Sequence, residues 1–129
     1  MSTRFDIDLE KVRAFIAEKE LKRRGVIDAR FARATRDFDV IVERIVAEVN
    51  PLRIYQYGSL LDRKRFTEIS DIDIAVEGLQ GAERYFRTLG IAMDGTSLPV
   101  DLIEIEKVPQ DIASRIRTRG RVVYERSGS

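Results

Sequence analysis

The stretch that decides the fold is Tyr55–Glu77, which reads YQYGSLLDRKRFTEISDIDIAVE. It contains an apolar run ending at Gly58-Ser59, a short polar segment, and then the alternating sequence DIDIAV. Alternation with a period of two predicts a strand. On such a strand Asp71 and Asp73 lie on one face, and the apolar side chains lie on the other.

The two aspartates are the first candidates for chemistry. Their Cα atoms lie about 6.6 Å apart at a rise of ~3.3 Å per residue, so both carboxylates can lean toward one cation such as Mg²⁺. Without a cation, their charges repel and raise the pKa of one of them. On its own, however, a D-x-D pair is more often an ordinary solvated strand face.

Gly58 and Ser59 change that balance. Glycine lets the backbone approach a ligand closely, free N–H groups at a helix start attract phosphate, and the Ser59 hydroxyl adds a donor. Alone, the pair reads as a turn with a helix N-cap. A phosphate cradle and a carboxylate pair within one stretch together indicate a site for a metal–nucleotide complex.

Two further features could extend this site. Asp101 begins the predicted strand VDLIEI, and beside the D-x-D strand it would complete a two-metal site with ions roughly 3.5–4 Å apart; taken alone, it is an ordinary strand-end residue. Glu104 should point to the opposite face of that strand. Arg63 belongs to the cluster DRKR after Gly58-Ser59, which either contacts a triphosphate or forms a solvated loop.

The composition excludes several classes of protein. The chain has 129 residues, a formal net charge of +1, and neither cysteine nor histidine. Disulfides, thiolate sites, catalytic triads and histidine-bound zinc are therefore excluded, and acid–base or metal chemistry must come from Asp and Glu. The charge gives no indication of direct nucleic-acid binding, and no apolar run approaches the ~18 residues of a membrane span. The absence of cysteine fits a cytoplasmic location.

The predicted fold class is α+β, with a small mixed sheet and helices mainly on one face. Two N-terminal helices are predicted, because Gly25 suits a helix stop and Asp28 a new N-cap. The first carries the stripe Leu9, Val12 and Ile16, with Phe15 beside it, and the second a stripe from Phe31 to Val49. Residues 1–50 would pack as a helical segment on a core spanning 51–126. Strands are expected near 52–57, 71–77, 100–105 and 121–124, and further helices at 80–89 and 109–119.

The motifs resemble those of the nucleotidyltransferase superfamily named for DNA polymerase β. Its mark is an apolar residue before Gly-Ser, then DhDh on one strand and hDh on the next, where h is apolar. The matching residues are Tyr57-Gly58-Ser59, Asp71-Ile72-Asp73-Ile74 and Val100-Asp101-Leu102. The chain looks most like the minimal nucleotidyltransferases, or MNT proteins, over about Leu52 to Glu125. SDIDIAVEGL, PVDLIEIEKVP and RIRTRGRVVYE are similar to typical MNT strings.

This resemblance implies a role for each residue. Gly58 and Ser59 would bind the triphosphate of ATP, Asp71 and Asp73 would hold bridging Mg²⁺ ions, and Asp101 would bind the catalytic metal and help activate an acceptor hydroxyl. Two features depart from the family: the segment between Gly-Ser and the first Asp is one residue longer than usual, and LLDRKRF replaces the usual small residues.

The resemblance also implies a partner. Prokaryotic MNT proteins are often encoded beside HEPN-domain proteins, as antitoxin and toxin. HEPN toxins typically need a catalytic histidine, which this chain lacks. The chain would therefore be the antitoxin, transferring AMP to a hydroxyl of the toxin, with tyrosine as the expected acceptor. The alternatives are an antitoxin that masks the toxin without catalysis and a small-molecule nucleotidyltransferase of the aminoglycoside-modifying kind. The oligomeric state stays open, a homo-oligomer included.

Overall fold

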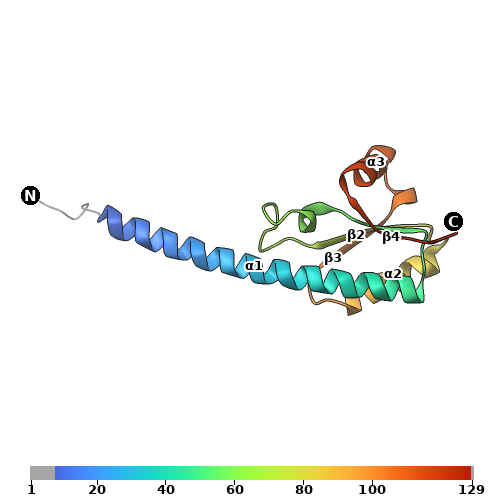
Figure 1. Ribbon diagram of the computed structural model, residues 1–129, viewed down its shortest axis with the longest axis horizontal. Helices are drawn as coiled ribbons and strands as arrows, with labels where there is room; N and C mark the ends of the chain where they lie inside the picture. Colours follow the sequence, from blue (N-terminus) through green and yellow to red (C-terminus); the bar gives the residue numbers. More distant parts are fainter. Residues whose placement is uncertain (1–7, 129) are drawn as a thin grey trace, which may run out of the picture.

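A computed structural model describes residues 8–128 of the chain (Figure 1). Four strands form one sheet, and three α-helices surround it: α1 (Leu9–Glu48), β1 (Arg53–Gln56), β2 (Ile72–Glu77), α2 (Ala82–Asp94), β3 (Val100–Glu104), α3 (Gln110–Arg119) and β4 (Arg121–Glu125). Two short 3₁₀ helices, η1 (Gly58–Leu61) and η2 (Ile105–Lys107), follow β1 and β3. The predicted α+β class and the predicted strands are confirmed.

The sheet is mixed, with the strand order β3-β2-β1-β4. β2 and β3 are parallel, and α2 connects them, because parallel neighbours need a crossover. β1 runs antiparallel to both β2 and β4. The consequence for the site is that β2 and β3 begin at the same end of the sheet.

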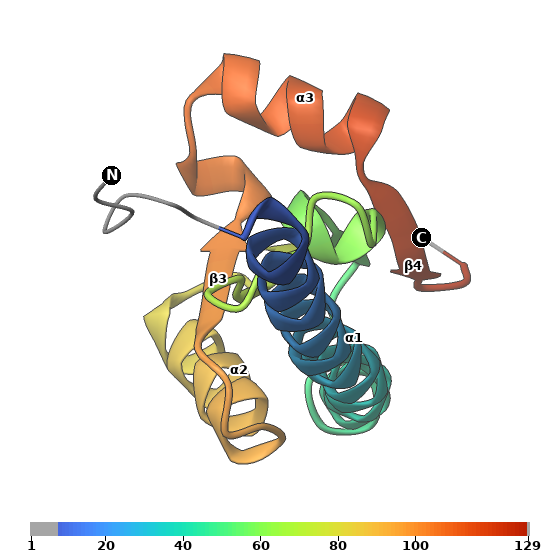
Figure 2. The same cartoon turned by 90° about the vertical axis from the view of Figure 1, so that its left-hand side faces the viewer.

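The two faces of the sheet are covered by different helices. α1 and α2 pack on one face, and α3 lies on the other (Figure 2). Alternation along β2 puts Ile72, Ile74 and Val76 into the main core, where all three are fully buried. A smaller cluster under α3 contains Tyr55, Ala75, Ile105, Ala113 and Ile116. The aspartate-bearing face is thus the face that α3 covers only in part.

The prediction of two N-terminal helices is wrong: α1 is one helix of 40 residues. Gly25 lies inside it, and Asp28 does not cap a new helix but pairs with Arg63, with 2.6 Å between Oδ1 and Nε. A single glycine costs a helix only about 1 kcal/mol relative to alanine. Between Gly25 and Asp28 stand only Val26 and Ile27, and Ile27 is buried. Burial of Ile27 and the Asp28 ion pair therefore carry the helix through the glycine.

Only the second half of α1 packs on the sheet. Ala34, Phe38, Ile41 and Ile45 are buried against it, as the predicted stripe requires. Leu9, Val12, Phe15 and Ile16 lie on a part of α1 that extends beyond the sheet, and all four are exposed (Figure 1). The predicted helical segment 1–50 thus contacts the rest of the domain from Ile27 onward; its residues 1–7 lie outside the described ones. No helix in the described part of the chain combines the length and apolar character needed to cross a membrane.

The continuity of α1 predicts that Gly25→Ala stabilises the protein. A Cβ at Gly25 would meet nothing within 4 Å, and alanine favours a helix interior by about 0.5–1 kcal/mol. Gly95→Ala is the matched control. Its Cβ would lie 2.5 Å from Cγ1 of Ile41, so this substitution should destabilise the protein. Far-UV circular dichroism and urea unfolding measure both effects. Lower helicity in Gly25→Ala would indicate a break in α1 at this position.

Candidate active site

The parallel pairing of β2 and β3 brings two of the predicted carboxylates together. Asp73 and Asp101 are direct partners in the register of these strands, so their side chains leave the same face of the sheet as neighbours. Asp71 immediately precedes β2. The three residues thus stand at one end of the sheet, where β2 and β3 begin.

Gly58 brings the backbone against this carboxylate pair. Its φ is +80°, and a Cβ built on it would lie 2.1 Å from Oδ2 of Asp73. Any side chain would therefore both strain the backbone and collide with the carboxylate. η1 starts at Gly58 and contains Ser59, so the predicted phosphate-binding pair lies beside Asp73.

Tyr57 is a site residue that sequence reasoning did not single out. Its hydroxyl donates a hydrogen bond to Oδ2 of Asp101 at 3.2 Å. Burial, together with the negative charges of Asp101 and Asp73, raises the pKa of Tyr57 well above its usual range. The phenol therefore stays a neutral donor that holds Asp101. Its place directly before Gly58, next to the predicted phosphate-binding pair, was the available signal in the sequence.

Asp73 has the most perturbed carboxyl of the site. Burial, followed by the negative charges of Asp101 and Asp71, raises the pKa of Asp73 from 3.8 to about 7. The native fold thus holds these like charges close together. A group of this kind in a cleft is a candidate functional residue.

The donor set suits a hard divalent cation. Asp71, Asp73 and Asp101 offer only carboxylate oxygens, which Mg²⁺ prefers. Among residues 8–128, however, no three Asp, Glu, His or Cys side chains are gathered closely enough to hold a metal ion in the present geometry. Side-chain rotation of the aspartates would be needed to close a metal site.

A basic cavity of about 290 Å³ opens beside Gly58. Three guanidinium groups line it, from the loop after η1 and from one side of α3, where residues four apart are neighbours: Arg65, Arg115 and Arg119. The prediction named Arg63, whose guanidinium instead pairs with Asp28 of α1 and does not line this cavity. The sequence shows the spacing of Arg115 and Arg119, but it does not show which side of α3 faces Gly58.

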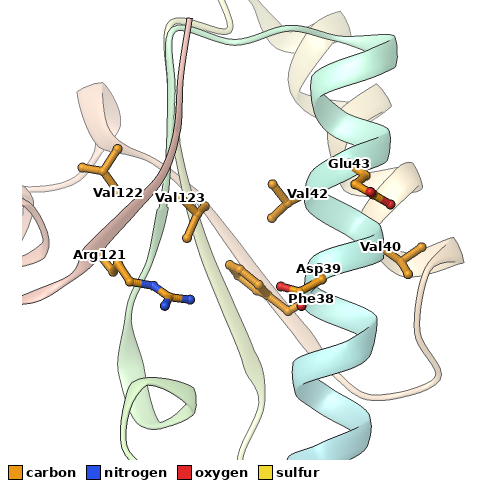
Figure 3. A pocket seen from close by; sticks show the side chains of 8 residues that line it. All are labelled: Phe38, Asp39, Val40, Val42, Glu43, Arg121, Val122 and Val123. Atoms are coloured by element: carbon orange, nitrogen blue, oxygen red, sulfur yellow. The ribbon is translucent and has the colours of Figure 1, made fainter.

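A larger cavity, of about 610 Å³, lies between α1 and β4 (Figure 3). Phe38 and Val42 point into it from α1, and Val123 faces them from β4. None of the predicted site residues lines it. Its walls combine apolar side chains with the charged residues Asp39, Glu43 and Arg121. The candidate active site is therefore the smaller, charged cavity beside the aspartates.

The raised pKa of Asp73 predicts how stability depends on pH in metal-free protein. Between about pH 4 and pH 7 the folded protein retains a proton that the unfolded chain has lost, so stability falls as pH rises through this window. Asp73→Asn removes this charge. The increase in its melting temperature over wild type should grow between about pH 4 and pH 7 and then level off. Thermal unfolding in EDTA at several pH values measures this, with exposed Asp39→Asn as control. A gain in melting temperature that does not depend on pH would contradict the raised pKa of Asp73.

Comparison with known proteins shows the family of the chain. The family model described as "Polymerase beta, Nucleotidyltransferase" matches residues 33–129, and no curated protein matches the sequence. The chain is similar to the crystal structure of a mutant of the toxin-antitoxin MntA-HpeT, with a TM-score of 0.53 and 18% identity over 67% of this chain and 71% of that chain. A second mutant of that complex gives a TM-score of 0.49 and 19% identity, over 67% and 70%. The family match spans well over half of the sequence, and the chain therefore belongs to the polymerase β nucleotidyltransferase family.

Proposed function

We propose that the chain transfers AMP from ATP to the hydroxyl group of a tyrosine on a HEPN-type toxin and so acts as its antitoxin. The observation that carries this proposal is the pairing of Asp73 with Asp101 directly against the backbone of Gly58. Membership of the nucleotidyltransferase family supports the transfer. The likeness in fold to the toxin-antitoxin MntA-HpeT suggests the kind of partner.

In this proposal the nucleotide binds beside Gly58. The backbone at Gly58 and Ser59 holds the triphosphate, and Arg65, Arg115 and Arg119 neutralise its charge from the basic cavity. Arg63 retains its predicted role only if its guanidinium leaves Asp28. In-line geometry then places the leaving pyrophosphate on the arginine side and the acceptor on the Asp101 side.

The carboxylates are the proposed holders of Mg²⁺. Asp71, Asp73 and Asp101 would bind it, and when bound it neutralises developing charge on the phosphates and favours ionisation of the acceptor hydroxyl. The Tyr57 hydroxyl orients Asp101 through the hydrogen bond of 3.2 Å. The cluster of negative charge that raises the pKa of Asp73 is the feature a cation would relieve.

The proposed reaction balances without a further reactant. The acceptor oxygen attacks the α-phosphorus of ATP, the bond from that phosphorus to the bridging oxygen breaks, and pyrophosphate leaves with the electron pair. The acceptor proton passes to solvent or transiently to Asp101. Because the chain has no histidine, positioning and charge stabilisation must supply most of the catalysis.

A masking antitoxin is the second candidate, and the exposed apolar side chains of the first half of α1 favour it. A protein that only covers a toxin needs a contact surface but no intact carboxylate site. Loss of the carboxylates therefore separates the two functions.

The double change Asp71→Ala and Asp73→Ala should reduce AMP transfer at least about a hundredfold, since charge stabilisation in such sites is worth that much. The core face of β2 is unaffected, so the variant should stay folded. A HEPN-type toxin that the chain modifies should gain ~329 Da per site, one AMP less water, only with wild-type protein. Intact-mass spectrometry of recovered toxin and growth of toxin-expressing cells are the two readouts. Glu83→Ala, exposed on α2, is the control.

Full protection of cells by the folded double variant would favour masking and contradict the enzymatic function. Protection lost together with the mass adducts would support it. Transfer of AMP to aminoglycosides, with none to the toxin, would point to the small-molecule alternative.

The basic cavity makes a separate prediction about ATP. Arg119→Ala should raise KM for ATP about tenfold or more, because a hydrogen bond to a charged group contributes ~1.5–3 kcal/mol. Arg63→Ala should change KM less, since that side chain is paired with Asp28. Steady-state kinetics over a range of ATP concentrations measure both, with exposed Arg87→Ala on α2 as control. A larger effect of Arg63→Ala than of Arg119→Ala would reverse the two assignments.

A further inference from the structure

The first half of α1 is an arm that extends beyond the domain. We define the arm as residues 9–26 of α1; at 1.5 Å per residue it is about 27 Å long. Figures 1 and 2 show it projecting past the edge of the sheet. The family match begins at residue 33, so the arm lies outside the part of the chain that resembles other nucleotidyltransferases.

One side of the arm carries large apolar side chains in solvent. Leu9, Val12, Phe15 and Ile16 are 60%, 40%, 62% and 59% exposed; we refer to these four as the arm patch. Their spacing of three, four and seven places them on one side of the helix. Leu9 and Ile16 continue the stripe that further along α1 packs Ile27, Ala34 and Phe38 into the core. The arm patch is thus built like a packing surface, and no described residue buries it.

The arm leaves the domain at the end of the sheet that carries the carboxylates. The loop before Asp71 is held against α1 where the arm joins the rest of the domain. Arg30 donates a hydrogen bond to the carbonyl of Ser70 at 2.8 Å, and Arg23 forms an ion pair with Glu68 at 3.4 Å. Asp71 follows Ser70 directly. A protein bound to the arm would therefore lie beside the candidate active site.

Charge limits what the arm can bind. The arm contains six Lys or Arg and three Glu, a net charge of +3, although the whole chain is only +1. Two of its acids are already paired within the helix, Glu18 with Lys22 and Glu20 with Arg23 and Arg24. Lys11, Arg13 and Lys19 flank the arm patch. Pairing with the arm of a second copy would bring two positive surfaces together, which disfavours a dimer through the arm.

We propose that the arm binds the toxin by laying the arm patch into an apolar groove that is rimmed by acidic side chains. This is the recognition of an amphipathic helix by a groove, with anchors three, four and seven residues apart. The proposal rests on the proposed function and deepens it, because it assigns recognition of the protein acceptor to a segment outside the catalytic core. Tight contact at Phe15 and Ile16 supplies affinity, and the basic flank supplies orientation and association rate.

The test compares two single substitutions in the full-length chain. Ile16→Glu places a charge in the arm patch, whereas Leu21→Glu places one at a position 67% exposed on another side of the arm. We expect Ile16→Glu to weaken binding of the purified toxin at least tenfold and to raise KM for the toxin without lowering kcat. Leu21→Glu should stay within about twofold of wild type. Both variants should keep wild-type helicity and the same thermal shift with Mg²⁺ and ATP.

The outcomes separate this proposal from the proposed function. Toxin modified by wild type and by Ile16→Glu with equal KM overturns the role of the arm and leaves the enzymatic function standing. Toxin neither bound nor modified by wild type overturns both. Arm-dependent dimerisation in sedimentation, or arm-dependent binding to phosphatidylserine vesicles with no change in toxin affinity, would assign the arm patch to another occupant and overturn the proposal.

A charge-reversal variant gives a second readout. Lys11→Glu with Arg13→Glu leaves the apolar side chains intact but reverses the flank. It should slow association with the toxin about tenfold at low salt and converge toward wild type as salt is raised. An association rate equal to wild type at low salt would contradict an acidic rim on the toxin.

Discussion

The structure depends on holding like charges on neighbouring parallel strands. The register of β2 and β3 sets Asp73 beside Asp101, and the lack of a Cβ at Gly58 leaves the space that the Asp73 carboxylate occupies. This repulsion is tolerated because the opposite face of the same strand buries Ile72, Ile74 and Val76 under α1 and α2. Burial of apolar surface contributes ~25 cal/mol per Å² to stability, and this contribution can offset the repulsion between the carboxylates. The buried core thus holds the carboxylates in an arrangement whose repulsion a bound cation would reduce.

α1 performs two tasks with one sequence pattern. Its apolar stripe has the same period from Leu9 to Ile45. The stripe is buried from Ile27 onward and exposed at Leu9 and Ile16. The change lies in what covers the helix, and periodicity alone carries no information on that. Polar contacts mark the boundary instead, since Asp28 and Arg30 tie the helix to the loop that precedes Asp71.

The sequence predicted the features that depend on neighbours along the chain. Strand alternation, the D-x-D pair and the glycine before Ser59 are local, and the strands follow from them. Three features depended on distant partners and were missed or placed differently. Continuity through Gly25 rests on burial of Ile27 in the main core, and the hydroxyl of Tyr57 reaches Asp101 only through the pairing of three strands. The choice between Arg63 and Arg65 is decided by Asp28, which lies 35 residues from Arg63 along the chain.

The size of the site bears on how such a small nucleotidyltransferase selects an acceptor. The charged cavity of about 290 Å³ is at the lower limit of the volumes of small-molecule sites. The residues that line it, among them Tyr57 and Gly120, suit the polyphosphate of a nucleotide. Asp101 does not line this cavity, so an acceptor beside Asp101 would lie outside it. An acceptor on the surface of a large partner needs no enclosure, because the partner brings its own shape. Selection must then occur at contacts away from the reacting atoms, where binding energy can position the hydroxyl. The arm, outside the catalytic core and beside its open end, is suited to that task.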